Sequence, residues 1–284
     1  MTEPKSLRNI AIIAHVDHGK TTLVDCLLKQ SGTFRENEAT SERMMDSNDL
    51  ERERGITILA KTTSVVWGDT RINIVDTPGH ADFGGEVERI LSMVDGAIVL
   101  VDAAEGPMPQ TKFVVSKALK IGLRPIVAVN KIDKPERRPD EVINEVFDLF
   151  DALGADDDQL DFPILYGSAK NGWMSTQYEE ERVDMDELFD LVVKHVPEPT
   201  VEEGPFRMLA TTLGSDAFVG RLLTGRVESG KLKVGATVQA LSRIGQKIEQ
   251  FRVTRIQAFR GLSEQDIDEA QAGDIVSIAG MSKA

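Results

Sequence analysis

Short apolar runs alternate with amphipathic helical patterns along the first two thirds of the chain. Asn9–Ala14 predicts a buried strand, and Lys20–Gln30 predicts a helix with Leu23, Leu27 and Leu28 on one side. Further strands and helices are predicted at Ile72–Val75, Ala97–Val101, Pro125–Val129, 84–93, 109–120 and 139–152. This alternation favours the α/β class, with a mostly parallel sheet and helices on both faces.

Three segments of this first part depart from the alternation. Residues 33–60 are polar and charge-rich, and so long a connection is typical of functional or mobile segments. Ala155–Asp161 predicts an acidic surface turn, and Tyr178–Asp190 is an acidic lead into a helix. That helix is predicted to stop at His195–Pro199, because proline cannot continue it, and we expect a linker over 196–206.

Beyond this linker the pattern changes to β-rich runs separated by glycines. The runs are Leu222–Val227, Val234–Leu241, Lys247–Ile256 and Asp274–Ile278. Short strands with glycine turns predict a small β-barrel. The sequence therefore predicts two domains, an α/β domain over residues 1–200 and an all-β barrel domain over residues 201–284.

The net charge of the 284-residue chain is −14, and it is unevenly distributed. Residues 135–206 hold 5 basic and 20 acidic side chains, whereas residues 1–134 have a net charge of −2 and residues 207–284 of +3. This balance argues against indiscriminate electrostatic binding of nucleic acid or an anionic membrane. No apolar run approaches the roughly 18 residues of a membrane span, and no signal peptide is evident, so we expect a cytoplasmic, soluble protein. Cys26 is the single cysteine, which excludes an intramolecular disulfide and predicts a buried, unreactive thiol.

The first candidate site lies between the first predicted strand and helix. The run Ala14–Thr22 reads AHVDHGKTT, in the strand–loop–helix setting that a phosphate-binding P-loop requires. Its backbone N–H groups and the helix N-terminus point at an anion, and Gly19 allows close approach. Lys20 is placed to reach the β- and γ-phosphates, and the Thr21 hydroxyl can bind Mg²⁺. The general pattern has glycine where this chain has Ala14.

A second motif, Asp76–His80, follows the predicted strand Ile72–Val75. A carboxylate at a strand end, here Asp76, can hold Mg²⁺ through a water molecule, and the Gly79 N–H can bond a γ-phosphate. An Asp before a Pro-Gly turn is common in itself. The motif gains weight because it follows a P-loop along the same chain.

A third motif, Asn130–Asp133, ends another strand and has the chemistry to recognise guanine. The Asp133 carboxylate can accept both N1–H and the 2-amino group, which adenine does not present together. The Asn130 amide can bond the N7 side of the base, and the Lys131 stem can cover a ring face. Ser168-Ala169-Lys170 follows a further apolar run and would complete a base pocket.

A fourth motif, Arg54–Ile58, lies inside the irregular stretch 33–60. Thr57 there can offer a hydroxyl and backbone groups to Mg²⁺ and the γ-phosphate, as in a segment that a nucleotide orders. The alternative interpretation of these residues is a strand start, and both can hold together.

The remaining histidines and aromatic residues predict structural roles. His15 and His18 are expected to pack within the loop, and His195 to interact with the end of its helix. Trp67 and Trp173 are too scattered to form a base-stacking platform. The sequence shows no Cys/His cluster for zinc.

Taken in order, the four motifs and the Ser168–Lys170 triplet resemble the ribosome-associated translational GTPases. Met45–Arg54, His80–Arg89 and Gly106–Thr111 are more similar to the TypA/BipA group of that family than to its elongation factor G or LepA groups. Gly220–Gly235 resembles the second-domain β-barrel of these factors. Family members continue beyond this barrel, so we expect the chain to be an N-terminal portion.

The resemblance also implies a role for each matching residue. Phosphates and base would be bound by Asp17, His18, Gly19, Lys20, Thr21, Thr22, Gly79, Asn130, Lys131, Ile132, Asp133, Ser168, Ala169 and Lys170. Thr21, Thr57 and Asp76 would bind Mg²⁺. His80 would orient the attacking water, and Val16 and Ile56 would form the apolar gate that restrains it until activation.

As the resemblance implies, the protein would bind GTP and hydrolyse it to GDP with Mg²⁺, acting as a conformational switch on the ribosome. Its partners would be ribosomal RNA and proteins, contacted by a monomer in stress adaptation or ribosome assembly, with no DNA or membrane partner. The acidic stretch 135–206 is expected to face solvent. The alternative is a GTP-regulated interaction module that hydrolyses little. A P-loop ATPase or small-molecule kinase is disfavoured, because Asn130–Asp133 would then have no role.

Overall fold

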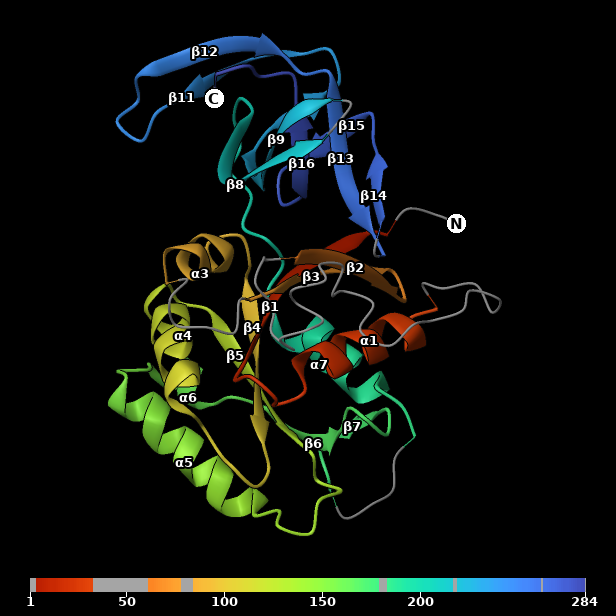
Figure 1. Ribbon diagram of the computed structural model, residues 1–284, viewed down its shortest axis with the longest axis vertical. Helices are drawn as coiled ribbons and strands as arrows, with labels where there is room; N and C mark the ends of the chain where they lie inside the picture. The colour runs from red at the N-terminus through yellow and green to blue at the C-terminus, as the bar shows by residue number, and fades with distance from the viewer. Residues whose placement is uncertain are drawn as a thin grey trace. The chain divides into compact units, whose positions relative to one another are not determined.

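The structure is a computed structural model that describes residues 4–32, 61–77, 84–178, 183–216, 219–261 and 263–283. The chain divides into two compact units, Met1–Glu198 and Pro199–Ala284, and each is described by itself. Figure 1 shows that the first unit mixes helices with a sheet and that the second is built of strands. No described helix is long and apolar enough to cross a membrane.

The first unit is built on a sheet whose described strands have the order β2-β3-β1-β4-β5-β6-β7. The strands are β1 (Ser6–Ala14), β2 (Lys61–Trp67), β3 (Thr70–Asp76), β4 (Gly96–Asp102), β5 (Arg124–Asn130), β6 (Ile164–Ser168) and β7 (Trp173–Ser175). β1, β3, β4, β5 and β6 are parallel, and β2 and β7 pair antiparallel at the two edges. Every residue of β4 is buried, as expected for a strand covered on both faces. The predicted mostly parallel sheet is confirmed.

Helices cover both faces of this sheet (Figure 1). They are α1 (Lys20–Gln30), α3 (Gly84–Leu91), α4 (Pro109–Lys120), α5 (Pro139–Ala152), α6 (Asp157–Leu160) and α7 (Asp186–His195). In Figure 1, α3 to α6 lie on one side and α1 and α7 on the other. α1 has the predicted bounds, and Leu23, Leu27 and Leu28 are buried as its pattern predicts.

One prediction in this unit, the acidic surface turn Ala155–Asp161, needs correction: the segment is acidic and mostly exposed, but it is not a simple turn. The segment contains the short helix α6, which begins at a capping box in which Asp156 and Gln159 bond each other's backbone. Gln159 is buried and donates to two backbone carbonyls at and just after the end of α4, at 3.0 and 3.1 Å. The acidic composition predicts full exposure, but the buried Gln159 amide anchors this short helix to the end of α4.

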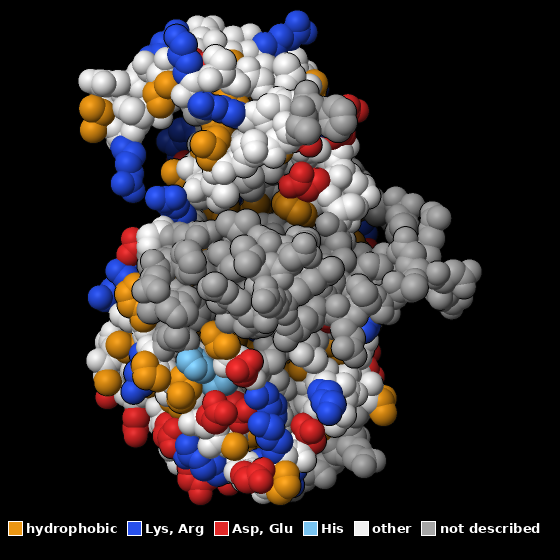
Figure 2. Space-filling model, in the orientation of Figure 1, with side chains coloured by type: hydrophobic (Ala, Val, Ile, Leu, Met, Phe, Trp, Pro, Cys, Tyr) orange, Lys and Arg blue, Asp and Glu red, His pale blue; other side chains and the backbone are white. Residues whose placement is uncertain are grey.

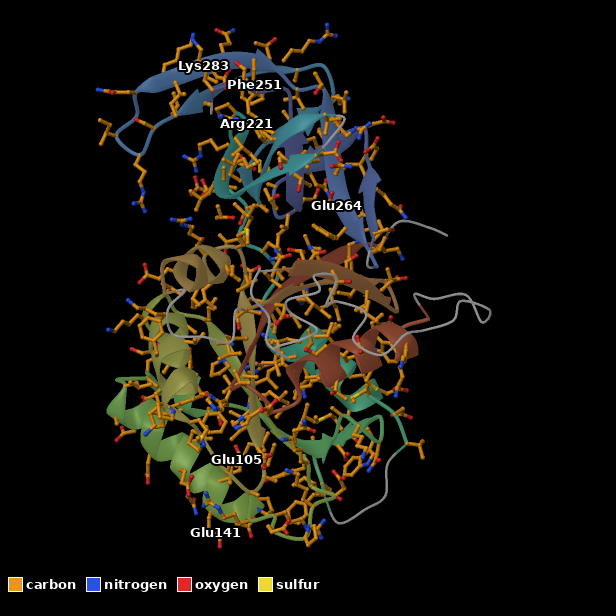
Figure 3. The ribbon with its side chains drawn as sticks, viewed as in Figure 1. Glu105, Glu141, Arg221, Phe251, Glu264 and Lys283 are labelled. Atoms are coloured by element: carbon orange, nitrogen blue, oxygen red, sulfur yellow. The ribbon has the colours of Figure 1, made fainter. Side chains whose placement is uncertain are left out.

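The second unit is a small β structure around its own core. Its described strands are β8 (Arg207–Asp216), β9 (Gly220–Ser229), β10 (Lys231–Lys233), β11 (Thr237–Leu241), β12 (Lys247–Arg252), β13 (Arg255–Arg260), β14 (Ser263–Asp266), β15 (Glu269–Gln271) and β16 (Ile275–Ala279). Five form a sheet in the order β14-β13-β16-β9-β8, and β10-β15 and β11-β12 pair separately. Val227, Ile256 and Val276 are fully buried in the core beside Phe251, which is labelled in Figure 3.

Two strand predictions in this unit need correction. The run Val234–Leu241 forms a strand only from Thr237, because Val234 to Ala236 are in a turn that bonds back to neighbouring chain segments. The run Lys247–Ile256 is divided between β12 and β13, since Val253 and Thr254 bond outside both ladders. Hydropathy alone does not reveal such breaks, because Val253 is buried like Phe251 and Ile256, the apolar strand residues on either side of it.

The fold brings the motifs to one edge of the first sheet. The five parallel strands end at Ala14, Asp76, Asp102, Asn130 and Ser168. Because carboxyl ends of parallel strands share an edge, all the described motifs lie together there.

Candidate nucleotide-binding site

The loop after β1 leads into α1 with its backbone in left-handed conformations. Asp17 has a φ of 66° and Gly19, the N-cap of α1, a φ of 95°. No side chain caps α1, and its first turn holds no acidic residue. The positive end of the helix dipole and the N–H groups of its first turn are therefore available to an anion.

Lys20 joins this loop to the end of β3. Its ammonium pairs with Asp76 Oδ1 at 2.7 Å and also donates to the Thr77 carbonyl oxygen. The Thr77 hydroxyl in turn donates to the carbonyl of Ile12 in β1, at 2.7 Å. Both side chains of the Lys20–Asp76 pair are almost fully buried. A cation and a carboxylate are thus held together where the phosphate chemistry is predicted.

Asn130 connects three of the strand-end loops. Its amide Nδ2 donates to the His18 carbonyl at 2.8 Å, and its Oδ1 accepts the N–H of Ala169 at 2.9 Å. A Cβ atom on Gly19 would lie 2.5 Å from Asn130 Nδ2, so glycine is required at that position. The structure therefore places Asn130 as the joint between the phosphate loop and the Ser168–Lys170 loop.

The residues after Asn130 separate into a buried anchor and exposed polar groups. Ile132 is buried, and its N–H donates to the Gly167 carbonyl at 3.1 Å. Lys131, with a φ of 65°, is partly exposed, and Asp133 is exposed. Asp133 thus presents its carboxylate at the rim of the sheet, whereas the Lys131 ammonium turns to Asp102 and to the Asp17 carbonyl.

The loop after β6 contributes mainly backbone groups to this rim. Ser168 is buried and its hydroxyl accepts the N–H of Asn171 at 3.3 Å, while Lys170 is exposed. Ser168 and Ala169 therefore contribute a fixed turn to the site, and only Lys170 of the triplet presents its side chain to solvent.

His18 turns its side chain into the protein. Its Nδ1 accepts the Asp102 N–H at 3.3 Å, which leaves Nε2 to donate to the Glu105 carboxylate at 3.3 Å. Burial lowers the pKa of His18, which favours a neutral ring. The His15 ring meets it edge-on, with centroids 5.2 Å apart. Both histidines pack within the loop, as the sequence predicts.

The sequence analysis missed Asp102, the last residue of β4. This carboxylate is completely buried and pairs with Lys131 at 2.7 Å and Lys134 at 3.4 Å. Its signal was present, because an Asp directly follows the apolar run Ala97–Val101 at the same sheet edge as the motifs. Asp102 belongs to none of the motifs, because it contacts Lys131 and Lys134 and would not itself touch a nucleotide.

Two described residues, Thr21 and Asp76, would be the ones to hold Mg²⁺. Thr21 and Asp76 offer hydroxyl and carboxylate oxygens, the ligand type that Mg²⁺ prefers. No group of three or more His, Cys, Asp or Glu side chains with the arrangement of a metal site occurs among the described residues. Mg²⁺ usually takes only one or two protein oxygens and completes its shell with phosphate oxygens and water, so this sparse set is appropriate.

Four residues of the predicted site, Ile56, Thr57, Gly79 and His80, lie outside the described residues. Val16, the other predicted gate residue, is partly buried, Thr21 is partly buried and Thr22 is exposed. The structure thus assembles the P-loop, the lysine–aspartate pair and the guanine-side motifs, while the catalytic and gate predictions stay predictions.

Residues outside the site behave as structural groups. Trp67 stacks on Phe189 with ring centroids 4.6 Å apart, which supports a packing role. Cys26 is partly buried, and burial raises the pKa of its thiol, which is consistent with low reactivity. His195 is the last residue of α7, and burial lowers its pKa.

The chain is similar to curated proteins over nearly its whole length. Two curated relatives are named large ribosomal subunit assembly factor BipA: that of Bacillus subtilis (strain 168) is 56% identical over 276 residues, and that of Escherichia coli (strain K12) is 55% identical over 280 residues. The matches cover 97% and 98% of this chain but 45% and 46% of the relatives, so the chain spans about half their length.

Two solved structures share the fold. The crystal structure of a bacterial selenocysteine-specific elongation factor EF-Sec matches with a TM-score of 0.72 and 22% identity, over 98% of this chain and 42% of that chain. Translation elongation factor SelB from Methanococcus maripaludis, in complex with the GTP analogue GppNHp, matches with a TM-score of 0.71 and 25% identity, over 99% and 53%.

The family comparison covers both units. Residues 220–284 match the family described as elongation factor Tu domain 2. Residues 5–198 match the family described as the elongation factor Tu GTP binding domain. These residues include all the strand-end loops of the first unit, and the chain therefore belongs to the elongation factor Tu GTP-binding domain family.

Proposed function

We propose that this chain binds GTP and hydrolyses it to GDP as the nucleotide switch of a ribosome-associated factor of BipA type. One observation carries the proposal: Asn130 joins the phosphate loop to the Ser168–Lys170 loop, next to the rim that exposes Asp133. Membership of a GTP-binding domain family and relatives named as ribosomal assembly factors support it.

Electrostatic stabilisation would supply most of the catalysis. Phosphoryl transfer needs little covalent chemistry from the protein, and charge stabilisation with correct positioning carries it. The α1 N-terminus and Lys20 would hold the phosphates, while Thr21 and Asp76, with Thr57, would hold Mg²⁺. When bound, Mg²⁺ would neutralise charge on the β- and γ-phosphates.

The proposed catalytic residue is His80. A neutral imidazole is a weak base towards water, so its work would be to orient the attacking water and stabilise charge. Val16 and Ile56 would keep it from that water until the switch is activated. Turnover would therefore depend on a partner that opens this gate.

The proposed partner is the ribosome, because the relatives are named as large ribosomal subunit assembly factors. The charge distribution suits a docked encounter. Figure 2 shows basic side chains, with a few acidic ones, over the visible face of the second unit, and both acidic and basic side chains over the lower part of the first. The exposed tip between β11 and β12 carries Arg243 and Ile244 and precedes Lys247. We propose that this hairpin contacts ribosomal RNA, and that the protein acts as a cytoplasmic monomer in ribosome assembly or stress adaptation.

A titration with guanine and adenine nucleotides tests the base-recognition part of the proposal. GTP and GDP should bind much more tightly than ATP and ADP, because adenine does not present both donors to the Asp133 carboxylate. Equal affinity for GTP and ATP would contradict guanine recognition at this rim.

Sedimentation with ribosomes tests the proposed partner. The chain should sediment with ribosomes more with a GTP analogue than with GDP, and ribosomes should accelerate single-turnover hydrolysis. Nucleotide-dependent sedimentation without any hydrolysis would favour the alternative, a GTP-regulated interaction module. Equal sedimentation with the GTP analogue and with GDP would contradict the proposed switch.

A further inference from the structure

Asp102 occupies a central place between the two halves of the site. It ends β4, whose neighbours in the sheet are β1 and β5, the strands that lead to the phosphate loop and to Asn130–Asp133. It is paired in register with Asn130, and its side chain is completely buried. A buried carboxylate at this position requires several partners, since an unpaired charge there would be costly.

Both oxygens of the Asp102 carboxylate are in use. Oδ1 accepts the N–H groups of Ala104 at 2.7 Å and Glu105 at 3.4 Å. Oδ2 contacts the ammonium groups of Lys131 at 2.7 Å and Lys134 at 3.4 Å. Burial alone would raise the pKa of Asp102, but the Lys131 hydrogen bond, the Ala104 N–H and the two lysine charges outweigh it and lower the pKa to about 2. Asp102 is therefore charged at every working pH.

Lys131 is held at several points as a result. Its backbone adopts a left-handed φ of 65°, and its ammonium bonds both Asp102 Oδ2 and the Asp17 carbonyl. A lysine side chain has about 2 kcal/mol of rotamer entropy to lose on ordering, and a fixed ammonium removes most of that cost from any later contact. The aliphatic stem lies between these two fixed ends, and the side chain as a whole is 22% exposed.

The loop that follows Asp102 is also braced. The Arg138 guanidinium donates to the Ala104 carbonyl at 2.9 Å and pairs with Glu145 of α5. Glu105 accepts from His18 of the phosphate loop, and Figure 3 shows it at the end of the sheet to which the β4 arrow points. Asp102 is thus set in a loop that is itself fixed to α5 and to the P-loop.

We propose that Asp102 is a positioning residue for the purine ring. By holding the Lys131 ammonium, it would fix the aliphatic stem of that lysine as the surface on which the planar base lies. This inference rests on the proposed binding of guanine nucleotides. It assigns to Asp102 retention of the base, whereas Asp133 would select which base is retained.

The test is the dissociation rate of fluorescent GDP, with a matching inosine diphosphate probe. Asp102→Asn keeps an oxygen for the Ala104 N–H and removes the charge, and it should accelerate release of both probes by the same factor, about tenfold or more. Equal factors follow because the stem contacts a ring face and does not read the 2-amino group. Lys134→Ala is the matched control, since its longer contact and 43% exposed side chain predict a change below about twofold.

A double-mutant cycle separates positioning from a general structural effect. Lys131→Met keeps the length of the stem and removes the ammonium. If Asp102 acts through Lys131, the double variant should release GDP no faster than Lys131→Met alone. Two results would overturn the inference. One is a double variant whose increase in GDP release rate is the product of the increases in the two single variants. The other is an Asp102→Asn release rate within twofold of the parent.

If Asp102→Asn does not fold, two variants of Lys131 test the same inference. Lys131→Arg keeps a cation for Asp102, and its release rate should stay within about threefold of the parent, while Lys131→Met should be at least tenfold faster. Equal rates for these two variants would overturn the inference. A parent chain that binds no guanine nucleotide would instead overturn the proposed function, so the two failures are distinguishable.

Discussion

The proposed phosphate side and the proposed base side of the site are built in different ways. On the base side, Asn130 and Lys131 bond neighbouring loops of the protein itself, and Ile132 anchors the segment in the core. On the phosphate side, the helix N-terminus has no side-chain cap, and Lys20 is paired with the carboxylate that would face Mg²⁺. The base side is therefore fixed in advance, whereas the phosphate side consists of charges that must find new partners when phosphates and metal arrive.

This difference assigns different work to the two sides. A pre-organised pocket lowers the ordering cost of binding and gives retention and specificity. Charges that exchange partners make the state of the site depend on the nucleotide, which a switch requires. Each variant below alters one side, or the joint between them, and predicts a separate signature.

The largest effect is expected from His80→Ala on the phosphate side. Loss of a group that positions the attacking water should slow ribosome-stimulated turnover by about 10²- to 10⁴-fold. GTP affinity should be nearly unchanged, because the proposed binding contacts come from other residues. Single-turnover hydrolysis and equilibrium titration measure the two quantities. An unchanged turnover rate would remove His80 from catalysis.

Gly19→Ala should disrupt the joint between the two sides. The left-handed φ of 95° costs a non-glycine residue about 1–2 kcal/mol, and the new Cβ would lie 2.5 Å from Asn130 Nδ2. Displacing Asn130 also breaks buried hydrogen bonds that are each worth about 1–3 kcal/mol when one partner is left unpaired. We expect GTP affinity to fall by about 100-fold, with a lower melting temperature.

A matched control for this variant is Gly32→Ala. Gly32 also has a left-handed φ, of 68°, but no atom lies within 4 Å of its added Cβ. Gly32→Ala should lower the melting temperature, but the folded variant should bind GTP with the affinity of the parent. If both glycine variants bind GTP equally well, Asn130 is not the joint that the structure indicates.

The sequence predicted the elements of this site better than the contacts between them. α1 was predicted residue for residue, because its apolar spacing starts directly after the glycine that ends the loop. The strands β3, β4 and β5 each extend one residue beyond the carboxyl end of their predicted apolar runs, since Asp76, Asp102 and Asn130 complete the ladders. Polar residues at strand ends are invisible to a search for apolar periodicity, although here they carry the site.

The contacts could not be predicted because they join residues far apart in the chain. Nothing in the local pattern shows that Asp102 pairs with Lys131, or that Asn130 reaches His18 and Ala169. The strand β8 was also missed, because most of its residues are exposed and it lies at a sheet edge. Tertiary pairing, not propensity, decides both cases.

Asp133→Asn tests the base side alone. An amide cannot accept both donors of guanine, so GTP affinity should fall by about 10- to 100-fold, the range for a lost hydrogen bond to a charged group. Xanthosine triphosphate, which presents a carbonyl where guanine has its amino group, should bind the variant better than the parent does. Because Asp133 is exposed, the melting temperature without nucleotide should stay within about a degree of the parent.

An Asp133→Asn variant with parental affinity for GTP would move guanine recognition away from this rim. The hydrogen bonds of Asn130 and the ion pair of Lys131 would then serve the folding of the domain and not base recognition.

The smallest effect is expected from the protonation of His18, which lies between the two sides. Its neutral Nδ1 accepts the Asp102 N–H, and a proton there would place two donors against each other. Glu105 and Asp102 would partly compensate the new charge, while His15 opposes it. Because burial lowers the folded-state pKa below the ordinary value of about 6.5, the unfolded chain binds more protons, and stability should fall as the pH drops below that value.

The melting temperature and GDP affinity of the parent and His18→Gln, measured between pH 7.5 and 5.5, test this prediction. The parent should lose both as the pH falls, and His18→Gln should lose less affinity over the same range. His195→Gln is the matched control, because burial also lowers the pKa of His195, but it lies at the end of α7 outside the site. It should flatten the stability profile without changing the affinity profile. If His195→Gln instead changes the affinity profile as much as His18→Gln does, the pH response belongs to the whole domain and His18 does not couple the two sides.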